Sequence, residues 1–139
     1  MKKGLFIILL YFFVSNAVSA SDKEYPATYP ATMARVINSV TYLLDVDIGG
    51  QTQRITLSLA GVESPKMYLS SCEVERARFA KKFVQALLWP DETLLVSDVH
   101  RSKQGLQGDI HFAGRDLAGV LVGFNQARPN DVDGSWCNS

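Results

Sequence analysis

The stretch VINSVTYLLDVDIGGQTQRITLSLAGVESP, residues 36–65, decides the fold class. Apolar residues alternate with polar ones along both halves of this stretch, which is typical of strands that bury one face. The apolar positions are Val36, Val40, Tyr42, Leu44, Val46 and Ile48 in the first half, and Ile55, Leu57 and Leu59 in the second. Gly49 and Gly50 separate the halves, and glycine readily adopts the positive φ of a tight turn. The stretch therefore predicts a strand, a hairpin and a second strand that ends before Pro65.

The sequence after Pro65 predicts a helix, two more strands and a second helix. Apolar residues recur at helical spacing from Cys72 to Leu88, and Trp89-Pro90 ends that segment. Next we expect a strand over Thr93–Val99, a loop over residues 100–108, a strand over Asp109–Ala113 and a short helix over Asp116–Phe124. This order predicts an α+β, mainly β domain. It is that of a small five-stranded Greek-key barrel of the oligonucleotide/oligosaccharide-binding (OB) type, with one main helix and one or two short helices.

The composition is that of an ordinary folded domain. The chain has 139 residues, 14 Lys plus Arg against 14 Asp plus Glu, and 47% hydrophobic residues. This length supports one domain. The balanced charge argues against a basic protein that follows nucleic-acid phosphates, and the hydrophobic content argues against a disordered chain.

Residues 1–20 have the features of a signal peptide. A positive start at Lys2 and Lys3 precedes the apolar run Leu5–Val14, and small residues lead up to a cleavage position after Ala20. An uncleaved membrane anchor is the alternative, but the run is shorter than the roughly 20 residues that a bilayer-spanning helix needs. We therefore expect an exported protein, periplasmic or secreted, with no membrane attachment after cleavage.

The rest of the chain divides into a leader and one domain. Residues 21–33 contain two prolines and little apolar patterning, so we expect an extended leader, with the folded domain over residues 34–139.

Cys72 and Cys137 are the only cysteines. In an exported chain the simplest expectation is that they form a disulfide. A reactive thiol or a metal pair is the alternative, but no second Cys lies at short spacing.

Several segments, taken in order, resemble the staphylococcal (thermo)nuclease family, in particular its exported bacterial members. Residues 34–41 resemble the family's first strand and its Asp-Gly-Asp-Thr turn, and residues 57–66 resemble its Arg-Leu-x-Gly-Ile-Asp-x-Pro-Glu segment. Cys72-Glu73 resembles a Cys-x-x-Glu helix start. Residues 114–117 and the terminal Trp136-Cys137 match a late Gly-x-Asp-Leu turn and a Trp-Cys ending. The resemblance implies an OB-type barrel over about residues 34–137.

The resemblance also implies a phosphodiesterase centre with one Ca²⁺, but this chain departs from it. In the family two Asp hold the metal, a Glu activates water, and two Arg bind the phosphate, which suits a hard cation and a charged transition state. The matching positions are Val40 and Glu63 for the metal ligands, and Lys66 for the catalytic Glu. The arginines match Ser58 and Leu106, or Gly105 in place of Leu106 if the gap in the alignment shifts by one residue. Glu63 is the only carboxylate among them. We therefore assign no catalytic residue, no metal ligand and no cofactor.

Other charged residues lie near these positions. Asp45 and Asp47 are two residues apart, share one strand face and could in principle hold a cation. Arg54 and Arg101 lie near the missing arginines. We interpret the two Asp as part of an ordinary solvated strand face near a hairpin, and the two Arg as ordinary surface residues.

The sequence thus leads to an exported, non-catalytic binding or assembly module with a protein partner. A divergent Ca²⁺-dependent nuclease that cleaves DNA or RNA, using Asp45, Asp47, Glu63 and a displaced arginine, is the alternative. Nucleic-acid binding without cleavage is a third hypothesis. The slightly acidic chain left after residues 1–20 speaks against it, because such grooves need cations and stacking aromatics.

Overall fold

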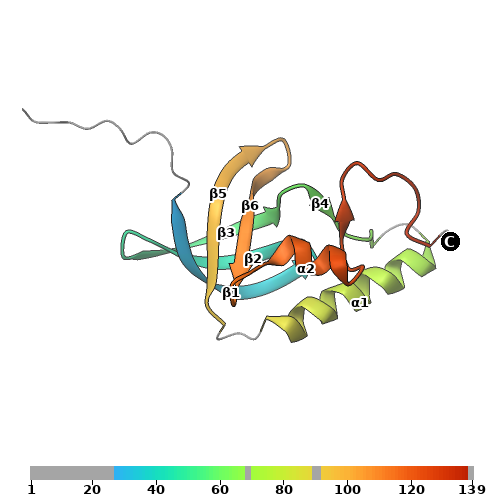
Figure 1. The fold of residues 1–139 in the computed structure, drawn as a ribbon, viewed down its shortest axis with the longest axis horizontal. Helices are drawn as coiled ribbons and strands as arrows, with labels where there is room; N and C mark the ends of the chain where they lie inside the picture. Colours follow the sequence, from blue (N-terminus) through green and yellow to red (C-terminus); the bar gives the residue numbers. More distant parts are fainter. Residues whose placement is uncertain (1–26, 68–69, 89–91, 138–139) are drawn as a thin grey trace, which may run out of the picture.

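Five strands close into a barrel, which confirms the predicted fold class. The computed structural model describes residues 27–67, 70–88 and 92–137. The barrel strands are β1 (Thr28–Asn38), β2 (Thr41–Ile48), β3 (Gln51–Leu59), β5 (Leu94–Ser102) and β6 (Gly105–Phe112). Neighbours pair antiparallel in the order β3-β2-β1-β5-β6, and a parallel pairing of β3 with β6 closes the ring (Figure 1). The expected signal peptide, residues 1–20, lies outside the described residues.

The β2–β3 hairpin forms as its alternation predicts, but the strand expected from Val36 to Ile48 is divided in two, because β1 ends at Asn38 and β2 begins at Thr41. Tyr42 and Leu44 point into the barrel with no exposed surface, and so does Leu57 on the return strand. Gly49 and Gly50 have φ of +63° and +86°, the left-handed conformation that a two-residue hairpin turn requires. These side chains form the centre of the hydrophobic core.

The first strand begins earlier than expected, at Thr28, so the last part of the expected leader belongs to the barrel. Residues 28–31 pair with β5, and residues 31–38 pair with β2. A register shift between Met33 and Arg35 inserts one residue, and it lets both Ala31 and Val36 point inward. The insertion interrupts the two-residue period, and Pro30 is unusual inside a strand, so the pattern did not reveal this segment.

The segment expected to be a loop over residues 100–108 is instead a hairpin. β5 continues to Ser102, β6 begins at Gly105, and only two residues separate them. The Ser102 hydroxyl accepts a hydrogen bond from the backbone N–H of Gln104 and donates to the carbonyl of Gly105. The outer half of β5 is mostly exposed on both faces. Because neither face is buried there, the sequence shows no alternation of apolar and polar residues, and it predicted a loop.

Two helices cover the barrel where the sequence predicts them. α1 (Ser71–Leu87) is capped by the hydroxyl of Ser70, and it packs its buried face against β1. α2 (Leu117–Gly123) is capped by the carboxylate of Asp116. Three two-residue strands complete the fold: β4 (Val62–Glu63), β7 (Arg115–Asp116) and β8 (Arg128–Pro129). Neither helix, nor any other helix in the described part, has the length and apolar character of a membrane span.

Candidate functional site

Four of the five positions matched to the nuclease centre meet in one pocket. Val40, Ser58, Glu63 and Lys66 line a hollow of about 540 Å³, between the end of β3, β4 and the β5–β6 turn. Most of its other lining residues carry a hydroxyl or an amide. We call this hollow the polar pocket. The four positions therefore lie together around one concavity, and their side chains differ from those that the resemblance implies.

Leu106, the fifth matched position, does not line the polar pocket. It lies on β6 opposite Leu57 and lines a separate, mainly apolar hollow of about 470 Å³ together with Val46 and Ile55. Neighbouring residues on a strand point to opposite sides, so Gln107 faces the polar pocket in its place. Grouping Leu106 with the other four was therefore wrong.

Short local contacts hold the floor of the polar pocket. The Asn38 side chain accepts the Val40 backbone N–H at 2.9 Å, which shapes the turn before β2. The hydroxyls of Thr41 and Ser58, opposite each other on β2 and β3, are 2.9 Å apart and hydrogen-bonded. The position matched to a phosphate-binding arginine thus carries a hydroxyl that is already engaged with its cross-strand neighbour.

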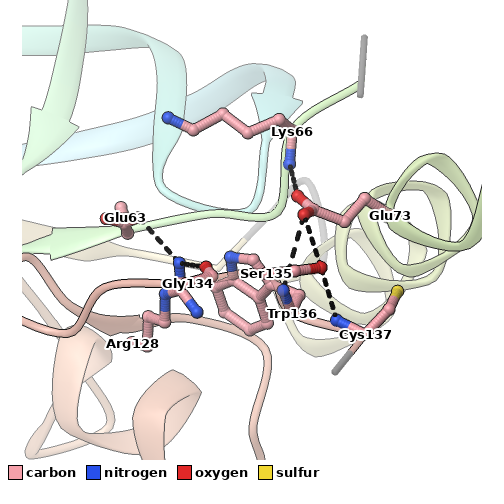
Figure 2. A network of polar contacts seen from close by, with 8 residues as sticks. All are labelled: Glu63, Lys66, Glu73, Arg128, Gly134, Ser135, Trp136 and Cys137. Carbon is pink, nitrogen blue, oxygen red and sulfur yellow. Dashed lines mark hydrogen bonds and ion pairs between the residues drawn. The ribbon is translucent and has the colours of Figure 1, made fainter. Parts of the chain in front are cut away.

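Glu63, the one matched carboxylate, is held by an arginine that the sequence analysis did not single out. Arg128 lies directly opposite Glu63 in the β4–β8 pair, and its Nη2 is 3.5 Å from Glu63 Oε2. The same Nη2 donates to the Gly134 carbonyl at 2.6 Å (Figure 2). No sequence motif marks this pairing, because it joins residues 65 positions apart.

Glu73 is the buried charge of this region, with 3% of its surface exposed. Its carboxylate accepts the Lys66 backbone N–H at 3.3 Å, the Ser135 hydroxyl at 3.1 Å and the Trp136 backbone N–H at 3.4 Å (Figure 2). Burial opposes ionisation, but these hydrogen bonds outweigh it and lower the pKa of Glu73 below its ordinary value. Glu73 thereby ties the pocket wall at Lys66 to α1 and to the C-terminal tail. In the sequence, Glu73 was noted only as part of a segment that resembles the family's helix start.

The C-terminal tail is fastened to α1 at two further points. Cys72 and Cys137 form the predicted disulfide, with Cα atoms 6.2 Å apart. Two guanidinium groups lie over the Trp136 ring. The Cζ atom of Arg128 is 4.7 Å from the ring centroid, and that of Arg76 is 5.4 Å from it. The Glu73 hydrogen bonds, the disulfide and the Trp136 contacts together place the tail against one side of the polar pocket.

The alternative metal ligands lie elsewhere. Asp45 and Asp47 line a different, shallow hollow on the outside of the barrel. The Arg54 guanidinium donates two hydrogen bonds of 2.8 and 3.0 Å to the Asp45 carboxylate, and these lower the pKa of Asp45. Asp47 accepts the Gly50 N–H within the hairpin turn. Arg101 is an exposed residue of β5. In the described residues, no group of three or more His, Cys, Asp and Glu side chains is placed to hold a metal ion.

The Asp45–Arg54 pair is exposed, so its removal should change little. We expect Asp45→Asn to leave the melting temperature within about 3 °C of wild type, because exposed ion pairs contribute little to stability. Differential scanning calorimetry with and without Ca²⁺ measures this. A Ca²⁺-induced rise in melting temperature that Asp45→Asn abolishes would contradict it and would place a metal site here.

Comparison with known proteins adds no assignment: no family model matches the chain, and no curated protein matches it significantly.

Proposed function

We propose that this chain is an exported, non-catalytic binding module on a nuclease-like barrel, and that the polar pocket is its recognition site. Export is supported by the composition of residues 1–20 and by the disulfide, since disulfides persist in oxidising compartments. The resemblance to the nuclease family supports the choice of pocket, because four matched positions line it.

The ion pair between Glu63 and Arg128 is the observation that carries the proposal. A Ca²⁺ site needs several oxygen ligands, and a phosphodiesterase also needs cations aimed at the developing charge on phosphate. Among the described residues that line this pocket, the one carboxylate faces a guanidinium that is also bound to Gly134, and the other charged residue is Lys66. Each lost stabiliser of the transition state costs about 10²–10³ in rate. Among the described residues, a pocket whose carboxylate is already paired and whose remaining charge is a single Lys is suited to recognition rather than to hydrolysis.

We expect the purified protein to cleave neither single-stranded DNA nor RNA in the presence of Ca²⁺ at a rate above that of Glu63→Ala. The measurement is gel analysis of end-labelled substrates over several hours, with Asp45→Ala as a second variant. Titration calorimetry with Ca²⁺ accompanies it. Ca²⁺-dependent cleavage that disappears in either variant would overturn the proposal in favour of a divergent nuclease.

A further inference from the structure

The polar pocket carries one cation without a partner among the described residues. Glu63 is paired with Arg128, whereas no ion pair of the described part involves the Lys66 ammonium group. The Lys66 backbone is fixed by its N–H donation to Glu73, and its side chain extends away from that carboxylate (Figure 2). The pocket therefore presents a positive group from an anchored piece of backbone.

Amide side chains line the pocket around this cation. Gln104 and Gln107 come from the β5–β6 turn and β6, and Asn130 comes from the C-terminal tail. Each amide offers a donor and an acceptor. An extended peptide main chain offers the same two groups in alternation, so these side chains can satisfy it without matching any particular side chain of the ligand.

The lining is poorly suited to a nucleic acid. Single-stranded nucleic acids are held by aromatic rings that stack on bases and by several cations along the backbone. None of the described residues that line the polar pocket is aromatic, and Lys66 is the one cationic residue among them. A single Lys acts as a point charge, which a lone carboxylate can match.

We propose that the polar pocket binds an extended peptide segment that carries a carboxylate, with Lys66 facing the carboxylate and Gln104, Gln107 and Asn130 bonding the main chain. This inference rests on the proposed function, since it requires a binding pocket.

The test is an NMR titration of ¹⁵N-labelled protein with two matched peptides at millimolar concentration. They are acetyl-Gly-Gly-Asp-Gly-Gly-amide and its Asn counterpart, which differ only in the negative charge. We expect both peptides to shift the side-chain amide signals of Gln104, Gln107 and Asn130. The Asp peptide should bind about threefold more tightly than the Asn peptide, the size of one exposed ion pair. High salt should remove this difference.

Two variants separate a direct charge contact from a general effect. Lys66→Gln should abolish the difference between the peptides while it keeps the backbone N–H that Glu73 accepts. Lys82→Gln, at an exposed position of α1, should leave the difference unchanged. A melting temperature close to wild type confirms that each variant is folded.

The other outcomes overturn the inference in distinguishable ways. Equal affinity for both peptides in wild type removes the role of Lys66. Shifts outside the polar pocket, or no shifts, remove the peptide site. If oligothymidylate shifts the side-chain amide signals of Gln104, Gln107 and Asn130 and neither peptide does, the pocket binds nucleic acid instead. The proposed function itself fails only if the cleavage assay detects Ca²⁺-dependent hydrolysis.

Discussion

Replacing both Cys72 and Cys137 by Ser is expected to lower the free energy of unfolding by about 4 kcal/mol. The bridge spans 65 residues, and in the chain-entropy account a loop of that length restricts the unfolded chain by about this amount. Cys72 is exposed and Cys137 is half-buried, so the serine hydroxyls remain within reach of water. The loss is a large fraction of the roughly 5–15 kcal/mol that stabilises a typical domain.

Equilibrium urea denaturation at neutral pH measures this effect. Wild-type protein in excess reductant provides the matched control, and it should unfold at the same urea concentration as the double variant in the same buffer. The slope of the transition should rise without the bridge, because the unfolded chain then exposes more surface. A double variant within about 1 kcal/mol of the oxidised wild type would show that the bridge stabilises far less than its loop length implies.

Glu73→Gln is expected to lower the melting temperature by about 10 °C at neutral pH. The change replaces one carboxylate oxygen by an NH₂ group that faces donors, so one or more of the hydrogen bonds from Lys66, Ser135 and Trp136 is lost. These donors lie in a half-buried region, where unpaired polar groups are costly. Glu75→Gln, at an exposed position two residues along α1, is the matched control and should change the melting temperature little.

The pH dependence gives a second signature of Glu73. Its pKa in the folded protein lies below the value of about 4.3 expected for an unfolded chain, so ionised Glu73 stabilises the fold. This contribution is fully present above the unfolded pKa and is lost as the pH falls through the folded pKa. Thermal melts of wild type and Glu73→Gln should therefore differ most at neutral pH and converge below about pH 4. A difference that stays constant down to pH 3 would contradict this role.

Sequence patterns predicted the elements that bury one continuous face. The β2–β3 hairpin and α1 follow directly from periods of 2 and 3.6, because burial of one face imposes those periods on the sequence. The same reasoning missed residues 28–33 and 100–105. There a bulge shifts the period, or a strand extends into solvent and keeps no period.

The polar pocket was predictable only in part. The segments that resemble the family, taken in order, grouped Val40, Ser58, Glu63 and Lys66. Each of these residues lies at a turn or near a strand end, and local sequence patterns locate turns and strand ends. Leu106 was misplaced, because an uncertainty of one residue in a strand exchanges its two faces. Gln104 and Asn130 carried no signal, since exposed amides are common in any turn or tail.

The amino-acid sequence by itself determined a small OB-type barrel with a main helix after the β-hairpin, and it paired the two cysteines correctly. The barrel follows from local hydrophobic periodicity, and the disulfide follows from the presence of only two cysteines, which allow one pairing. Only the tertiary structure placed Arg128 against Glu63 and buried Glu73 beneath the tail. Both contacts join segments more than 60 residues apart, and their partners are chosen by the path of the chain around the barrel. A sequence pattern reflects contacts between residues that are close along the chain. The pairing of charges at this pocket depends on residues that are distant along the chain and meet only in the fold.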